Sequence, residues 1–214
     1  MSDLENKVLL RSLREAGPRP AVDALVGLPS PLPRDAALLV IDVQKAIDHP
    51  SWGERNNPDA ERNIAALLDA WRRTNRPIYH VRHDSVEPDS TYRPGQPLHE
   101  FKPEAEPRPG ETVIAKRTNS AFIGTELESR LQASNQTLLV VTGVITNNSV
   151  EATVRMAGNL GFDAFLVEDA VFTFGRKDWN GVFRSASEVH AMSLANLDGE
   201  YCTVIRANEV LAAL

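Results

Sequence analysis

Three apolar segments of this chain carry polar residues that could take part in hydrolysis. The run ALLVID ends on Asp42, the run TVIAK ends on Lys116, and the segment TLLVVTGVITNNSVEAT carries Ser149 at the start of a predicted helix. A carboxylate can transfer a proton, an ammonium can stabilise negative charge, and a hydroxyl can attack a carbonyl carbon. If the three side chains meet, they would form a hydrolytic site.

Each of these residues also has a structural interpretation. Asp42 could cap the turn that follows its strand, Lys116 could be a solvated lysine at a strand exit, and Ser149 could assist a helix cap. The functional interpretation of Asp42 is a general acid or base whose pKa is set by burial and by a nearby cation. Lys116 would supply that cation, so the two assignments support each other.

The elements that must position these residues alternate regularly between strand and helix from Ala36 onward. Apolar runs and helical spacing of Ile64, Leu67, Leu68 and Trp71 are typical of a buried sheet covered by amphipathic helices. Pairs spaced as capping boxes mark three of the helix starts: Thr125 with Glu128, Asn148 with Glu151, and Ser185 with Glu188. Strands are predicted at 36–43, 77–81, 112–115, 137–142, 164–167 and 201–205, and helices at 59–74, 124–133, 148–160 and 185–197, with a short closing helix to 214.

This alternation indicates an α/β fold with three layers, α/β/α, around a mostly parallel six-stranded sheet. Parallel sheets of this kind place their reactive groups at the carboxyl ends of the strands. Asp42, Lys116 and Ser149 are therefore expected at one edge of the sheet.

The domain organisation has one main unit. Residues 1–34 are predicted to form an N-terminal helical arm, with a helix around Leu4 to Glu15, and a Pro-rich connector, and residues 35–214 are predicted to form one α/β domain. The segment from Asp84 to Gly110 is rich in proline and charge and directly follows a predicted strand. A loop of this length in a compact domain is usually functional, so it is expected to be a lid over the site.

The composition excludes several classes of function. The chain has 214 residues, 42% of them hydrophobic, and a formal net charge of -6, without a basic stripe. An acidic surface disfavours nucleic-acid binding. No signal peptide and no apolar run of the length that crosses a bilayer is present, and Cys202 is the single cysteine, so we expect a cytoplasmic protein that does not contact membranes.

Three motifs in this order resemble the isochorismatase-like hydrolase superfamily, also called the cysteine hydrolases. They are ALLVIDVQ, AKRTNSAFIGTELE and TGVITNNSVEATVRMAGNLGFDAFLVEDA, and the resemblance covers residues 35–214. It implies an isochorismatase-like (Rossmann-like) fold. It also implies a catalytic triad of Asp, Lys and Cys, whose first two members match Asp42 and Lys116.

The third member of that triad is different, because the position of the family's cysteine holds Ser149. A thiol with a pKa near 8.5 is easily activated, whereas a serine hydroxyl is far less acidic. Four explanations are open. The chain could be a natural serine hydrolase, an enzyme with non-covalent chemistry, a Cys-to-Ser variant, or a protein that has lost catalysis and only binds a ligand.

The resemblance implies hydrolysis of a small metabolite. The first expectation is cleavage of a C–N bond in an amide or carbamoyl compound by an Asp42–Lys116–Ser149 triad. The second is isochorismatase-type hydrolysis of a vinyl ether, in which Asp42 is the general acid and no covalent intermediate forms. The third is a ligand-binding protein without catalysis.

The resemblance also implies the remaining parts of the site. A cis peptide bond between Val144 and Ile145 would direct the Ile145 N–H, beside that of Ser149, at the substrate oxyanion. Five residues are expected at the substrate pocket, either from the resemblance or from their position in the sequence: His83, Asp84, Asn119, Phe122 and Asn148.

Neither a metal nor another cofactor is expected. Some relatives hold a metal through Asp and His residues beyond the second strand, but the required Asp-x-His spacing is absent around His80, His83, Asp84 and His99. No GxGxxG motif, P-loop or GxSxG elbow is present. The expected partners are a small-molecule substrate and, from the resemblance, further copies of the chain in a homodimer or homotetramer.

Overall fold

The computed structural model describes residues 27–214. The helix predicted around residues 4–15 lies outside the described residues. Among the residues described, no helix is both long enough and apolar enough to cross a membrane.

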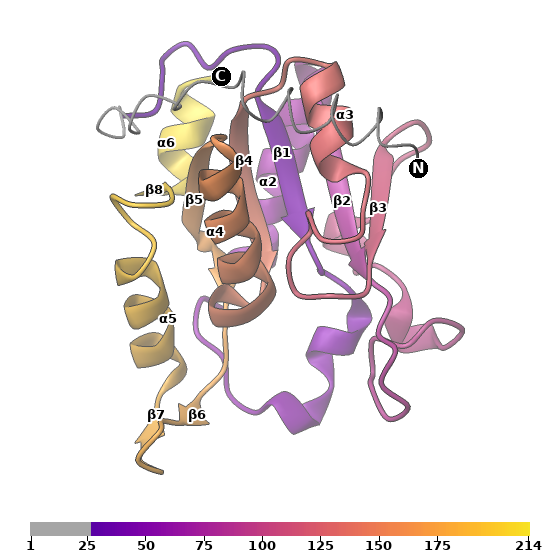
Figure 1. The fold of residues 1–214 in the computed structure, drawn as a ribbon, viewed down its shortest axis with the longest axis vertical. Coiled ribbons are helices and arrows are strands. Elements are labelled where there is room, and N and C mark those ends of the chain that lie inside the picture. Colours follow the sequence, from indigo (N-terminus) through magenta and orange to yellow (C-terminus); the bar gives the residue numbers. More distant parts are fainter. Residues whose placement is uncertain (1–26) are drawn as a thin grey trace, which may run out of the picture.

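A six-stranded sheet forms the centre of the molecule, and all five strand pairs within it are parallel (Figure 1). The strand order is β3-β2-β1-β4-β5-β8, which confirms the predicted α/β fold. The strands are β1 (Ala37–Ile41), β2 (Ile78–His83), β3 (Thr112–Lys116), β4 (Leu138–Val144), β5 (Asp163–Phe172) and β8 (Thr203–Ile205).

Helices cover both faces of this sheet and complete the three layers (Figure 1). One face of the sheet packs against α2 and α6. The other face packs against α3 and α4, and the residues that follow α5 pack at the edge of this second face. The helices are α2 (Ala60–Arg73), α3 (Leu127–Ala133), α4 (Glu151–Leu160), α5 (Ala186–Ala195) and α6 (Ala207–Ala212).

The apolar stripe of α2 buries the helix against the sheet as its spacing predicted. Ile64, Leu67, Leu68 and Trp71 are fully buried, and the Trp71 indole donates a hydrogen bond of 3.0 Å to the carbonyl of Ala36. Burial of each such side chain contributes roughly 1.5–3 kcal/mol relative to exposure. This packing fixes the start of β1 and therefore the position at which the strand ends.

The chain reverses its direction across the sheet between β1 and β4. From β1 it builds β2 and β3 on one side, and it then crosses to β4 and β5 on the other. Crevices at such a switch point, beyond the carboxyl ends of the strands, are where open α/β sheets bind ligands. Gly143 allows β4 to lie close to β1. A Cβ at position 143, where φ is +121°, would overlap the backbone of Ile41.

Two of the three predicted capping boxes are wrong. The helix α3 begins at Leu127, and the Thr125 hydroxyl donates to the Ala121 carbonyl rather than forming a box with Glu128. A π-helical turn, η5 (Thr146–Val150), runs directly into α4, so Asn148 does not cap a helix. Side-chain and backbone hydrogen bonds between Ser185 and Glu188 confirm the third box.

The long segment after β2 is packed onto the body. It contains the short helical turns η3 (Pro97–His99) and η4 (Pro103–Ala105), and Tyr92 and Ala105 within it are buried. Phe101 pairs with Gln44 in a β-bridge. The segment therefore covers the carboxyl end of β1, as a lid would; its opening and closing remain a prediction.

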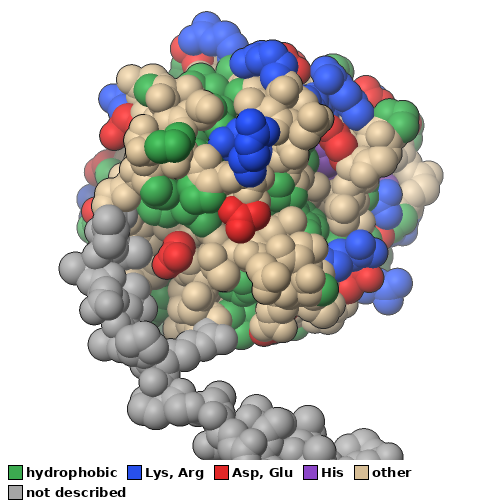
Figure 2. Space-filling view, turned by 90° about the horizontal axis from the view of Figure 1, so that it is seen from above, with side chains coloured by type: hydrophobic (Ala, Val, Ile, Leu, Met, Phe, Trp, Pro, Cys, Tyr) green, Lys and Arg blue, Asp and Glu red, His purple; other side chains and the backbone are tan. Residues whose placement is uncertain are grey.

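Acidic and basic side chains are interspersed on the face seen from above (Figure 2). No continuous basic stripe crosses this face. The picture agrees with the mixed charge pattern of the sequence, in which 23 Lys and Arg residues accompany 29 Asp and Glu residues.

Candidate active site

The structure brings Asp42, Lys116 and Ser149 together at the carboxyl edge of the sheet. Asp42 directly follows β1, Lys116 is the last residue of β3, and Ser149 lies in the π-helical turn after β4. All three are buried. The predicted convergence is therefore present in the geometry, even though β2 lies between the strands of Asp42 and Lys116.

The ammonium of Lys116 is the centre of the cluster. Its Nζ lies 2.6 Å from Asp42 Oδ2 and 3.2 Å from Ser149 Oγ. It also lies 3.1 Å from the carbonyl oxygen of Thr118 and 3.3 Å from His83 Nδ1. One fully buried cation thus touches both the carboxylate and the hydroxyl of the candidate triad.

Asp42 is held in an environment suited to proton transfer. Burial raises its pKa, against the opposing effects of Lys116, Ser149 and His83. Its Oδ1 atom is buried and accepts no hydrogen bond from any residue between 27 and 214. A carboxyl group of raised pKa, with one oxygen left without a partner, can give a proton to a bound molecule or take one from it.

His83 and Tyr92 close the other side of this cluster. Burial lowers the pKa of His83, and the neighbouring Lys116 lowers it further. The neutral ring can therefore accept from Lys116 through Nδ1. Tyr92 packs edge-on against the His83 ring, and its hydroxyl donates to the backbone carbonyl of Asp42 at 3.3 Å.

The turn that carries Ser149 is fixed from two sides. The carbonyl of Ile145 accepts from the backbone N–H groups of Asn148 and Val150. From α5, Ser193 donates to the carbonyl of Thr146, whose hydroxyl bonds His190 Nδ1 at 3.0 Å. The peptide bond between Val144 and Ile145, immediately before this turn, is cis, as the resemblance implied.

Gln44 is a structural member of the site that the sequence did not point out. Its side chain is fully buried, accepts from the backbone N–H of His83 at 2.7 Å and donates to the carbonyl of His99 at 2.7 Å. It thereby ties the end of β2 to the segment that covers the site. Only its position two residues after Asp42, in the motif ALLVIDVQ, could have indicated this role.

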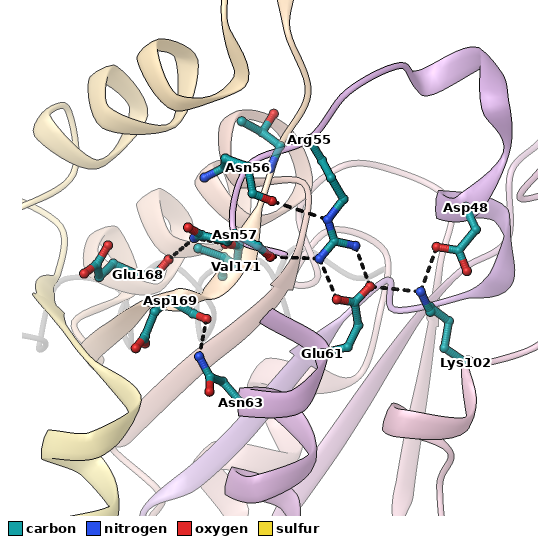
Figure 3. Close-up of polar contacts among 11 residues, drawn as sticks. Asp48, Arg55, Asn56, Asn57, Glu61, Asn63, Lys102, Glu168, Asp169 and Val171 are labelled. Carbon is teal, nitrogen blue, oxygen red and sulfur yellow. Dashed lines mark hydrogen bonds and ion pairs between the residues drawn. The ribbon is translucent and has the colours of Figure 1, made fainter. Parts of the chain in front are cut away.

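An ion network anchors the segment between β1 and α2 (Figure 3). The Arg55 guanidinium binds both carboxylate oxygens of Glu61, at 2.6 and 2.5 Å, and lies 3.4 Å from the centre of the Phe172 ring. Lys102, from the covering segment, donates to Glu61 at 2.9 Å and to Asp48 at 2.7 Å. The network joins the two segments that lie over the carboxyl edge.

The predicted substrate residues lie in different environments. The Asp84 carboxylate bonds Arg82 and His99. Burial raises the pKa of Asp84, but these hydrogen bonds outweigh burial and the pKa is lowered. Phe122 is buried and stacks on Phe162 in the core. Asn119 and Asn148 are exposed. Of the predicted set, His83 contacts the Lys116 side chain, whereas Asp84 contacts Lys116 through the backbone, with its N–H donating to the Lys116 carbonyl at 2.8 Å.

The histidines in and after β2 do not form a metal site in the part of the chain that the structure describes, where no group of three or more potential ligands comes together. His80 is fully buried and bonds Glu111 at 2.8 Å. Side chains of successive strand residues point to opposite faces, so His80 and His83 leave β2 on different sides. His99 bonds Asp84.

Cys202 cannot replace Ser149 as a nucleophile. It lies just before β8 and is fully buried in the core, and its backbone forms an isolated β-bridge with that of Asp198. Burial raises the pKa of its thiol to about 12. At neutral pH the reactive thiolate is therefore absent.

Comparisons with known proteins identify the family to which this chain belongs. Residues 36–209 match the family model for the isochorismatase domain. An uncharacterized isochorismatase family protein of Bacillus subtilis, YrdC, is 40% identical over 175 residues, which cover 82% of this chain and 94% of YrdC. The streptothricin hydrolase of Streptomyces noursei is 34% identical over 141 residues, which cover 64% of this chain and 50% of that enzyme.

A solved structure extends the agreement to three dimensions. A putative hydrolase of the isochorismatase family from Chromobacterium violaceum superimposes with a TM-score of 0.83 and 65% sequence identity, over 86% of this chain and 97% of that protein. The fold, the family model and the relatives lead to the same conclusion. This chain belongs to the isochorismatase family and is a hydrolase of that family.

Proposed function

We propose that this protein hydrolyses a C–N bond in a small amide or carbamoyl compound. The observation that carries the proposal is the double contact of Lys116 Nζ, at 2.6 Å from Asp42 Oδ2 and 3.2 Å from Ser149 Oγ, within a buried cluster. A base, a cation and a nucleophile within reach of one another are the parts that acyl transfer requires.

The first half of the reaction forms an ester. Ser149 Oγ attacks the carbonyl carbon and its proton passes to Asp42, whose raised pKa makes it a stronger base than an exposed aspartate. The positive charge of Lys116 stabilises the developing alkoxide. The C–N bond then breaks, the nitrogen takes the proton from Asp42, and the amine leaves.

The second half returns the free enzyme. Water attacks the ester carbon, Asp42 accepts a proton from the water, and that proton returns to Ser149 Oγ as the acid product leaves. The backbone N–H groups of Ile145 and Ser149 are the proposed donors to the oxyanion in both halves. Each donor would contribute about 3–4 kcal/mol of transition-state stabilisation.

A second candidate is hydrolysis of a vinyl ether without a covalent intermediate. The specific observation in its favour is the raised pKa of Asp42 together with the unpartnered Oδ1. A protonated Asp42 would donate its proton to the terminal vinyl carbon, and water would add to the resulting oxocarbenium carbon while a proton of the water returns to Asp42. The hemiketal formed in this way would then break its C–O bond and release an alcohol and a carbonyl compound. Ser149 would then be a spectator or would orient the water.

The two candidates predict opposite dependences on pH. As a base, Asp42 must be ionised, so the rate of amide hydrolysis rises as the pH increases through its pKa. As an acid, Asp42 must be protonated, so vinyl-ether hydrolysis falls over the same range. The pH profile of kcat/KM for the first substrate found distinguishes them.

The decisive experiment is an assay of four proteins on small amides, carbamoyl compounds and vinyl ethers. The wild type, Asp42→Asn, Ser149→Ala and Ser149→Cys are compared. Amide hydrolysis lost in both variants supports the first candidate, and vinyl-ether hydrolysis lost in Asp42→Asn alone supports the second. Binding of the compounds by the wild type without turnover, with amidase activity gained in Ser149→Cys, would contradict both.

A further inference from the structure

A buried histidine lies behind the turn that carries Ser149 and takes no part in the proposed reaction. His190 belongs to α5, which packs against η5 and β5. Its Nδ1 atom lies 3.0 Å from the Thr146 hydroxyl, and its Nε2 atom lies 4.0 Å from Oε2 of Glu168 on β5. A hydroxyl, an imidazole and a carboxylate therefore lie in a row next to the active site.

The positions of the protons in this row follow from the available partners. Burial lowers the pKa of His190, so at neutral pH the ring is uncharged and carries one proton. Among residues 27–214, the fully buried Thr146 hydroxyl has no other hydrogen-bond partner. A proton on Nδ1 would leave this hydroxyl without an acceptor and would turn the Nε2 lone pair toward the Glu168 carboxylate. The proton therefore lies on Nε2, and Nδ1 accepts from Thr146.

Glu168 is held in place opposite Nε2. It lies where the register between β4 and β5 shifts, and its backbone carbonyl accepts from the Asn57 side chain at 2.7 Å (Figure 3). Its Oε1 atom lies 3.3 Å from the Arg206 guanidinium. Because His190 Nε2 forms no hydrogen bond within residues 27–214, its contact with Glu168 is electrostatic. That contact favours the tautomer in which Nδ1 is the acceptor.

Thr146 is the first residue of η5, the turn that carries Ser149. The second contact of α5 with Thr146 is weaker. The Ser193 hydroxyl lies 3.3 Å from the Thr146 carbonyl but 2.6 Å from Glu151 Oε2, and it has one proton to donate. The bond to His190 is therefore the stronger side-chain anchor between this residue and α5.

We propose that His190 is a positioning residue of the active site. By accepting the Thr146 hydroxyl proton, it holds η5 so that Ser149 Oγ stays 3.2 Å from Lys116 Nζ. This role rests on the proposed function, in which Ser149 is the nucleophile. A displacement of about 1 Å at a reacting group can lower a rate about 100-fold. Loss of the bond should therefore lower kcat and leave KM nearly unchanged.

Two pairs of substitutions test this role. Thr146→Val removes the donor, and Thr142→Val is its matched control, because Thr142 is also fully buried but donates to the Leu39 carbonyl at 3.2 Å. His190→Leu removes the acceptor, whereas His190→Asn places an amide oxygen near the position of Nδ1. We expect kcat for amide hydrolysis to fall about 10-fold or more in Thr146→Val and His190→Leu. It should stay near the wild-type value in Thr142→Val and His190→Asn, and urea denaturation measures the stability of all four.

Alkylation of a thiol at position 149 gives a readout that does not depend on turnover. In Ser149→Cys, the neighbouring Lys116 ammonium should lower the pKa of the new thiol and speed its reaction with iodoacetamide. Addition of Thr146→Val or His190→Leu should slow this reaction about 10-fold or more, because the thiol moves away from the cation. Addition of Thr142→Val should leave the rate unchanged.

The outcomes separate this inference from the proposed function. A Thr146→Val enzyme with the kcat of the wild type, while Ser149→Ala is inactive, would overturn the inference and leave the proposed nucleophile in place. A His190 proton on Nδ1, seen by 15N NMR and assigned by difference from His190→Leu, would also overturn it. If no amide is hydrolysed, the proposed function fails and the alkylation rates decide: equal rates with Thr146→Val and Thr142→Val would overturn the inference.

Discussion

Lys116 Nζ lies 2.6 Å from Asp42 Oδ2, although 74 residues separate the two in sequence and β2 lies between their strands. The same Nζ contacts Ser149 Oγ. A buried carboxylate is costly unless a cation accompanies it. This pair therefore both stabilises the folded chain and sets the charge of the candidate active site.

Removal of that cation should affect activity and stability together. Lys116→Met leaves Asp42 buried without its cation, so the Asp42 pKa should rise further and the free energy of unfolding at neutral pH should fall by about 3–5 kcal/mol. Two measurements check this prediction. The kcat/KM for amide hydrolysis, recorded against pH, should fall at least about 100-fold at neutral pH. Urea denaturation gives the free energy of unfolding.

Lys45→Met is the control for this change. Lys45 pairs with Glu100 at the surface, where both side chains are well exposed. Exposed pairs contribute about 0–1 kcal/mol. Equal effects of the two lysine substitutions would contradict a special role for the buried pair.

Glu61 should make the fold sensitive to acid. Burial alone would raise its pKa, but hydrogen bonds from Arg55 and Lys102 lower it to about 2, from an ordinary value of 4.5. Because the folded-state pKa is depressed, the stabilisation is fully present above pH 4.5 and is lost as the pH falls toward 2. In Glu61→Gln, the free energy of unfolding should decrease less steeply across this range.

The control for Glu61 is Glu100→Gln, since Glu100 lies at the surface and bonds Lys45. Thermal unfolding at several pH values between 2 and 6 measures the slopes. Glu111, whose pKa is also lowered to about 2, remains in both variants and contributes a common background slope. Identical slopes for wild type and Glu61→Gln would refute the prediction.

Gly143 should tolerate no side chain. A Cβ there meets the backbone of Ile41, the residue before Asp42, and the φ of +121° is itself unfavourable for other residues. Gly143→Ala should therefore lower the free energy of unfolding by more than about 3 kcal/mol, because two backbones must move apart.

Gly110→Ala separates the two causes. Gly110 has a φ of +93°, but a Cβ there meets nothing within 4 Å. Its replacement by alanine should cost only about 1–2 kcal/mol, from the backbone conformation. Chemical denaturation measures the free energy of unfolding of both variants. Similar losses in Gly143→Ala and Gly110→Ala would contradict the prediction that the close contact of β4 with β1 excludes a side chain at Gly143.

Alkylation should distinguish the two candidate positions for a thiol. Iodoacetamide should leave the native wild type unmodified and fully active, because Cys202 is buried and its thiol pKa is raised to about 12. In Ser149→Cys, the new thiol beside Lys116 should react, and activity should be lost in proportion to the label. Inactivation of the wild type through Cys202 would be inconsistent with this account.

The sequence predicts the sheet, and the edge at which Asp42, Lys116 and Ser149 lie, for one physical reason: parallel strands end at a common edge. The approach of Lys116 to Asp42 within that edge depends on the strand order β3-β2-β1, which the apolar runs do not determine. Gly143 could not be interpreted in the same way, because its role depends on which strand becomes the neighbour of β4.

The contacts made by the loops could not be predicted. Gln44 and Tyr92 reach the site from irregular segments, in which no periodicity indicates where a side chain points. Asn148 failed as a helix cap because the π-helical turn moves the helix start past it. No pattern in the sequence indicates the hydrogen bond between His80 and Glu111. Alternation along β2 indicates only that the side chains of His80 and His83 lie on opposite faces of the sheet.

The most direct measurement is the mass of the protein during turnover of an amide substrate, quenched in acid and digested. If Ser149 is the nucleophile, an acyl group should be present on the peptide that contains Ser149, formed and lost at rates compatible with kcat, and absent in Ser149→Ala and Asp42→Asn. An unmodified Ser149 peptide at every time point, with Ser149→Ala as active as the wild type, would contradict the proposed nucleophile.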